Sequence, residues 1–187
     1  MSSVYFGGSR SLPSSPIVGQ VVKAILSSGR SITVGCATGA DQQVIQAVSP
    51  SSFSQLRVFA AFAQSGKGSW SGSAVAQVQQ CANMGGTVSW LAGGGLQVPI
   101  VARLMLRSIA GLAGASSAVF FSPGVGSLKV AGVAVERGIP VFAFSNPMPG
   151  LPKSQTGSPR GCAGSWVSAQ LMGFPCWRWA SAQSSLF

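Results

Sequence analysis

Short apolar runs alternate along the chain with segments whose apolar residues recur at helical spacing. After the run from Ser3 to Phe6, segment 16–27 repeats apolar residues every three to four positions, at Ile17, Val18, Val21, Val22, Ile25 and Leu26. This period predicts a strand followed by a helix that buries one face. The pattern continues, with strands expected at 31–35, 55–61, 87–91, 118–122 and 140–144 and helices at 40–48, 73–82, 98–112 and 128–137. The alternation predicts an α/β fold, a Rossmann-like mostly parallel sheet with helices on both faces.

The composition changes after Ser145, which divides the chain into two expected parts. Residues 1–145 form the Rossmann-like domain. Residues 146–161 are rich in proline and glycine, as is typical of a linker or an extended arm. Segment 162–187 carries Trp166, Phe174, Trp177 and Trp179, whose exposure to water is unfavourable. We therefore expect 146–187 to form an aromatic C-terminal extension that packs on the core or on a second copy, so a homo-oligomer is expected.

The charge of the chain restricts its chemistry. Twelve Lys and Arg residues oppose only Asp41 and Glu136, which gives a net charge of +10 over 187 residues, and histidine is absent. Imidazole catalysis and His-bound metals are thereby excluded. A hydrophobic content of 47% and a mean hydropathy of +0.42 indicate a folded chain with a sizeable core. The positive charge favours a polyanion, a nucleotide or an acidic surface as partner, and composition does not choose among them.

The cysteines and the longest apolar stretch bear on the cellular compartment. No CxxC spacing occurs among Cys36, Cys81, Cys162 and Cys176, so neither a zinc site nor a disulfide framework is predicted. No secretory apolar segment stands near the N-terminus. The apolar stretch 98–121 contains Arg103 and Arg107, which favours a buried helix and a strand over a membrane span. We expect a cytoplasmic protein with no membrane association, no metal and no cofactor.

Three glycine-rich turns each follow a predicted strand. They are Gly7-Gly8-Ser9-Arg10, Gly35-Cys36-Ala37-Thr38-Gly39-Ala40-Asp41 and Pro123-Gly124-Val125-Gly126-Ser127. In a parallel sheet they converge on its carboxyl edge, where glycine amides and helix starts bind phosphate and Arg10 supplies a charge. The candidate ligand-binding residues are Gly7, Gly8, Ser9, Arg10, Gly35, Thr38, Gly39, Asp41, Gly124, Gly126 and Ser127. The alternative interpretation is that these glycines only permit tight turns between sheet and helix.

The two acidic residues have different expected roles. Asp41 lies in the first turn of a predicted helix, where its negative charge is favourable without any further function. Alternatively, it accepts hydrogen bonds from a ribose or a base, or pairs with Arg10 and orders the loop. Glu136 stands beside Arg137 at the far end of its helix and is expected to be a solvated surface residue.

Three further basic residues are candidates for contact with nucleic acid. Lys67 lies in Gly66-Lys67-Gly68-Ser69, which lacks the first glycine of a phosphate-binding P-loop because Ala61 occupies that position. It is expected in a loop that contacts ligand or nucleic acid. Arg103 and Arg107 lie one helical turn apart and place two guanidinium groups on one face. We expect that face to be exposed, with a contact to an anion or a subunit as the alternative.

At these turns the chain resembles the SLOG superfamily, the Rossmann-like group that includes DprA/Smf, the LOG phosphoribohydrolases and the YspA-like proteins. The resemblance rests on Val4 to Arg10, Thr33 to Asp41, Pro123 to Ser127 and the segment Gly138-Ile139-Pro140-Val141, and it covers roughly residues 3–145. The YspA-like and DprA-like branch is the most similar. The resemblance implies a pocket for a nucleotide or a nucleotide-derived molecule, in a sensor or sequestering module.

The resemblance also implies two alternative functions. DprA-like proteins bind single-stranded DNA through a basic surface, and a charge of +10 fits that class. LOG enzymes cleave nucleotides at the N-glycosidic bond with a glutamate in their third motif, but Lys129 or Val130 occupies the equivalent position here. A nucleotide N-glycosidase would therefore have to rely on Asp41 as its catalytic residue.

Overall fold

The computed structural model describes residues 2–154 and 162–182. The strands of the sheet are β1 (Ser3–Gly8), β2 (Ser31–Val34), β3 (Leu56–Phe59), β4 (Thr87–Ser89), β5 (Ala115–Phe121), β6 (Val141–Phe144), β7 (Gly164–Leu171) and β8 (Phe174–Ser181). The helices are α1 (Pro16–Ser27), α2 (Ala40–Ala47), α3 (Val75–Asn83), α4 (Ile100–Gly111) and α5 (Val125–Glu136), and a 3-10 helix η1 spans Pro50–Gln55. The predicted α/β fold class, with a mostly parallel sheet, is confirmed.

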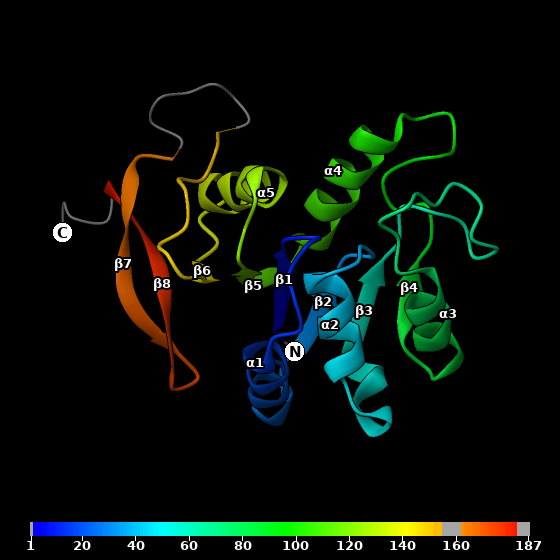
Figure 1. Cartoon of the computed structure of the whole chain (residues 1–187), viewed down its shortest axis with the longest axis horizontal. Coiled ribbons are helices and arrows are strands. Elements are labelled where there is room, and N and C mark those ends of the chain that lie inside the picture. Colours follow the sequence, from blue (N-terminus) through cyan, green and yellow to red (C-terminus); the bar gives the residue numbers. More distant parts are fainter. Residues whose placement is uncertain (1, 155–161, 183–187) are drawn as a thin grey trace.

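The sheet has the strand order β4-β3-β2-β1-β5-β6-β8-β7. Strands β1 to β6 pair in parallel, whereas β8 is antiparallel to β6 and β7 is antiparallel to β8. The chain proceeds from β1 outward through β2, β3 and β4, and then returns to the other side of β1 with β5 and β6 (Figure 1). The direction of progression thus reverses between β1 and β5, and open α/β sheets place their ligand crevice at such a point.

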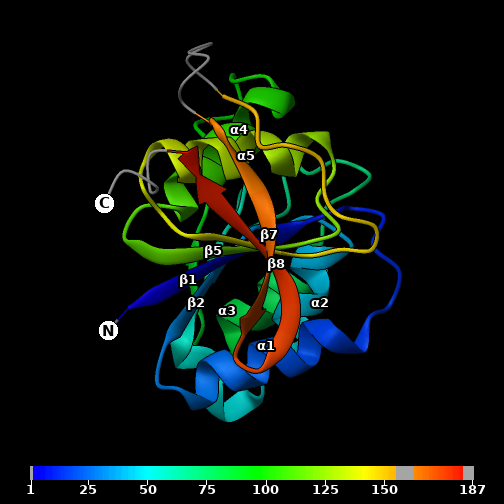
Figure 2. The same ribbon diagram turned by 90° about the vertical axis from the view of Figure 1, so that its left-hand side faces the viewer.

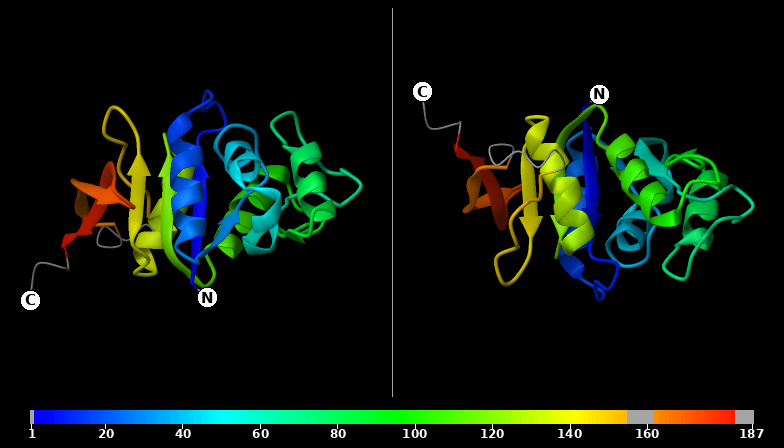
Figure 3. Two further views of the ribbon diagram at one scale, coloured as in Figure 1. Left: turned by 90° about the horizontal axis from the view of Figure 1, so that it is seen from below. Right: turned by 90° about the horizontal axis from the view of Figure 1, so that it is seen from above.

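Helices cover both faces of the sheet. Helices α1, α2 and α3 lie together on one face and α4 and α5 on the other, as the views from below and above show (Figure 3). Side chains of β1 alternate between two cores: Val4 and Phe6 pack towards α1 and α2, and Tyr5 packs with the core under α5. No helix in the described ranges combines the length and the hydropathy that a membrane crossing requires.

The start of α5 differs from its predicted position. This helix begins at Val125, three residues before its predicted start, because Gly124 is its N-cap and Val125 to Ser127 form its first turn. The third glycine-rich turn is therefore the start of a helix rather than a loop that precedes one. The 3-10 helix η1 was not predicted, and β5 begins at Ala115 rather than 118.

The sequence had indicated that the strand at 140–144 is the last one, but two further strands follow β6. Strands β7 and β8 form a hairpin around Met172 and Gly173, which have positive φ angles of 53° and 84° (Figure 2). Strand β8 joins the sheet beside β6 (Figure 1). Trp166 and Trp179 meet edge to face with ring centroids 5.3 Å apart, and both are buried in the core under α5. The aromatic segment thus packs on the core of its own chain. The homo-oligomer stays a prediction, and residues 155–161 and 183–187 of the predicted extension lie outside the described residues.

Candidate functional site

A cavity of about 650 Å³ opens at the carboxyl ends of β1 and β5, on the face of the sheet that α4 and α5 cover. Its volume lies within the range of roughly 300 to 1,000 Å³ that small-molecule sites occupy. The three glycine-rich turns meet here, as a parallel sheet predicts. Eight of the candidate residues line the cavity, namely Gly7, Gly8, Ser9, Arg10, Asp41, Gly124, Gly126 and Ser127, whereas Gly35, Thr38 and Gly39 are not among the lining residues.

Several glycines in these turns allow close packing between segments of the chain. A Cβ atom on Gly8 would lie 2.3 Å from the Phe121 carbonyl oxygen. Gly39, whose φ is +73°, would place a Cβ 2.4 Å from the carbonyl oxygen of Ser9. The Ala40 amide also donates to this Ser9 oxygen, at 3.0 Å. These contacts fix the β1–α1 turn against α2 and β5, so Gly8 and Gly39 are needed for the close packing of these segments.

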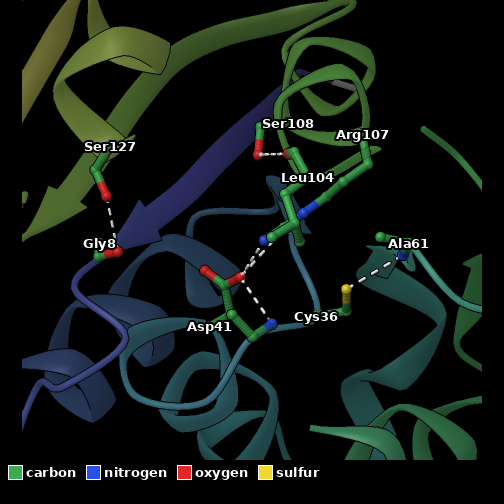
Figure 4. Close-up of polar contacts among 9 residues, drawn as sticks. Gly8, Cys36, Asp41, Ala61, Leu104, Arg107, Ser108 and Ser127 are labelled. Carbon is green, nitrogen blue, oxygen red and sulfur yellow. Dashed lines mark hydrogen bonds and ion pairs between the residues drawn. The ribbon is translucent and has the colours of Figure 1, made fainter. Parts of the chain in front are cut away.

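The hydroxyl groups predicted to face a ligand also hold the turns together. Ser127 Oγ donates to the Gly8 carbonyl oxygen at 2.8 Å, which ties the start of α5 to the end of β1 (Figure 4). Thr38 Oγ1 donates to the carbonyl oxygen of Arg10, and the hydroxyls of Ser9 and Ser11 lie 3.0 Å apart. These bonds therefore hold the turns that border the cavity, and of the four residues only Ser9, Ser11 and Ser127 line it.

The first turn of α5 leaves backbone amides available at the cavity. In this helix the first intrahelical donor is the Leu128 amide, which bonds to the Gly124 carbonyl oxygen at 2.9 Å. The preceding amides of Val125, Gly126 and Ser127 have no partner within a helix and carry partial positive charge. A Cβ on Gly124 or Gly126 would meet nothing within 4 Å, so the backbone here is open to a ligand. This arrangement favours an anion at the start of α5.

Two exposed cations, Arg10 and Lys129, line the same cavity. Arg10 belongs to the β1–α1 turn, and Lys129 stands one turn into α5. Within residues 2–154 and 162–182, neither side chain has a hydrogen-bond or ion-pair partner. Lys129 was missed as a site residue because the predicted helix began at Leu128, which hid its position just behind the glycine-rich first turn.

Asp41 lies in the first turn of α2 and pairs with Arg107 of α4. Pairing with Arg10, one of the alternatives from the sequence, does not occur. Both terminal nitrogens of Arg107 donate to Asp41 Oδ2 at 3.1 Å, and the Ala37 amide donates to the same oxygen at 3.1 Å (Figure 4). Gly35 makes room for this pair, since a Cβ there would lie 1.1 Å from Arg107 Nη1. Gly35 is therefore packed against the ion pair and does not face the cavity.

The expectation that Arg103 and Arg107 are exposed is wrong, because they are only 5% and 6% exposed. Arg103 donates from Nε to the Val98 carbonyl oxygen at 3.0 Å and from Nη2 to that of Gly68 at 3.2 Å, and a third bond joins it to Ala61. Backbone carbonyls thus compensate for its burial. Neither guanidinium offers an exposed contact to nucleic acid, whereas Lys67 on the neighbouring loop is exposed.

The second acidic residue also differs from expectation. Glu136 is half-buried, and its Oε1 atom accepts a hydrogen bond from Ser154 Oγ. Glu136 therefore links α5 to the segment that follows β6, and it is not a fully solvated surface residue. It does not line the cavity, which leaves Asp41 as the carboxylate there.

Burial and neighbouring charges shift the pKa values of two residues that line the cavity, Tyr5 and Arg107. Burial raises the pKa of Tyr5, which lines the cavity, to about 12, although the nearby Arg107 opposes this rise. Burial disfavours the charged form of Arg107, but Cys36, Asp41 and Tyr5 outweigh it and raise the pKa of Arg107 above its ordinary value. At neutral pH these two lining residues are therefore a neutral phenol and a charged guanidinium.

Neither a metal-binding cluster nor a similar known protein helps to interpret the site. No cluster of three or more His, Cys, Asp or Glu side chains suited to a metal ion occurs in the part of the chain that the structure describes. No family model, curated protein or solved structure matches this chain. The site is consequently interpreted from its own residues.

Proposed function

We propose that this protein binds a nucleotide or a nucleotide-derived anion in the cavity at the β1–β5 edge and acts as a sensor or sequestering module. The observation that carries the proposal is the set of groups that line one cavity: the open amides at the start of α5 and the side chains of Arg10 and Lys129. Helix-start amides with adjacent cations are a general means of holding phosphate. The position at the reversal point of an open α/β sheet supports the same ligand class.

The walls of the cavity support an anion that also has an apolar part. Leu104 and Met105 of α4 line the cavity, and so do Val101 and Val125, whose surfaces are 78% and 62% exposed. A nucleotide combines a phosphate for the amides with a base whose faces suit apolar contact. Inorganic phosphate or a sugar phosphate would leave these side chains without a partner.

Calorimetric titration with AMP, GMP, CMP and UMP tests the proposal. We expect one or more of them to saturate a single site, and we expect Arg10→Ala to weaken that binding about tenfold to a hundredfold, because it removes a charge-assisted hydrogen bond. Lys129→Ala should weaken binding in the same direction. Lys23→Ala is the matched control, since Lys23 is exposed on α1 and does not line the cavity. Unchanged affinity in both the Arg10 and Lys129 variants would refute the proposal.

The same titrations distinguish the two alternative functions. Single-stranded DNA binding through the basic surface would weaken steeply with salt and would be insensitive to mononucleotides, whereas a pocket ligand should show a modest salt dependence. A nucleotide N-glycosidase would release free base, and Asp41→Asn would abolish that release. Base release that survives in Asp41→Asn would exclude Asp41 as the catalytic residue.

A further inference from the structure

The two carboxylate oxygens of Asp41 have different surroundings. Oδ2 accepts three hydrogen bonds, one from the Ala37 amide and two from Arg107. Oδ1 has no hydrogen-bond partner among the described residues, although the Asp41 side chain is only 6% exposed. Figure 4 shows this second oxygen directed away from the guanidinium, and Asp41 is one of the residues that line the cavity.

An ionised carboxylate oxygen accepts hydrogen bonds and cannot donate them. Oδ1 is not one of the fully buried side-chain atoms that lack a partner among the described residues, so it is accessible at the cavity wall and open to a donor group on a ligand. The pairing with Arg107 fixes the carboxylate through Oδ2 and leaves Oδ1 as the free acceptor. Arg107 also balances the negative charge of Asp41, so that an anionic ligand can occupy the cavity beside it.

We propose that Asp41 Oδ1 accepts a hydrogen bond from a neutral donor on the ligand, so that the cavity selects anions which carry such a donor. This inference rests on the proposed function and makes Asp41 a specificity-determining residue for it. A nucleotide offers two donors of this kind, the sugar hydroxyls and the N–H groups of the base. Inorganic phosphate offers neither an apolar part nor a neutral donor at a distance from its charge.

Calorimetry on the wild-type protein tests the inference by changes in the ligand alone. The tightest of the four nucleotides is compared with its dideoxy counterpart, which lacks both sugar hydroxyls, and with a counterpart whose base carries no N–H donor. We expect one of the two to bind at least about tenfold more weakly, because a hydrogen bond to a charged group is lost. Which of them loses affinity identifies the donor. If both counterparts bind within about twofold of the parent, the inference is wrong while the proposed function stands.

A variant provides the second test. In Asp41→Asn, which keeps the shape of the side chain, the preference for the parent nucleotide over the weaker counterpart should shrink to less than about threefold. Retention of the full preference in a variant whose circular dichroism matches the wild type would overturn the inference. If no nucleotide saturates the wild-type protein, the proposed function fails, and this inference fails with it.

Discussion

The substitution Gly35→Ala tests how the Asp41–Arg107 ion pair that lines the cavity is built. The added Cβ would lie 1.1 Å from Arg107 Nη1 and 2.4 Å from Asp41 Oδ2, so the guanidinium must leave its position. Both side chains are more than nine-tenths buried, and removal of one partner from a buried pair costs about 3 to 5 kcal/mol because the other charge loses its compensation. We expect Gly35→Ala to lower the free energy of unfolding by about that amount, measured by urea denaturation at neutral pH.

The matched control is Gly126→Ala in the first turn of α5. A Cβ on Gly126 would meet nothing within 4 Å, and alanine favours a helix over glycine by about 1 kcal/mol. This variant should therefore be as stable as the wild type or slightly more stable. A loss of less than about 1 kcal/mol in Gly35→Ala would refute the reasoning, because it would show that Arg107 can leave Asp41 without penalty.

Three further predictions concern stability. Tyr5 is the only tyrosine, and burial raises its pKa from 10.0 to about 12, so the unfolded chain loses the phenolic proton at a lower pH than the folded chain. The free energy of unfolding should therefore fall by up to about 3 kcal/mol as the pH rises between these values, and this fall should be absent in Tyr5→Phe. Absorbance titration of the folded protein should report the raised pKa directly. Arg103→Met should cost about 2 to 4 kcal/mol in urea denaturation, since three carbonyl groups lose a charged donor. Trp179→Ala should cost about 3 to 5 kcal/mol by the same assay, whereas exposed Val167→Ala should have little effect.

The alternation of strands and helices along the chain up to β6 could be predicted from the sequence because each element buries one face within its own segment. Pro16–Ser27 shows this best, since its apolar positions are the ones that pack on the sheet. The same local patterns predicted Asp41 in the first turn of α2 and predicted that three turns meet at one edge of the sheet. The hairpin of β7 and β8 was missed because Met172, at the first turn position, is not one of the residues that usually mark a tight hairpin.

The partners within the site could not be predicted, because they depend on distant segments. Arg103 and Arg107 share a helix face, and the sequence gives no sign that this face turns inward, since Asp41 lies 66 residues from Arg107. Gly35 illustrates the same problem: its missing side chain accommodates a guanidinium from another helix, although its position in a glycine-rich turn indicated a ligand contact. Lys129 was missed because a helix start that contains glycine has weak local signals.

The central claim is that the cavity at the β1–β5 edge holds a nucleotide-type anion. Amide resonances of the isotope-labelled protein, followed by NMR during titration with the tightest-binding nucleotide, test it most directly. We predict saturable shifts at Gly7, Gly8, Gly126 and Ser127, with amides of the β7–β8 hairpin unchanged. Shifts confined to residues outside the cavity, or no saturable shift with any of the four nucleotides, would contradict the claim.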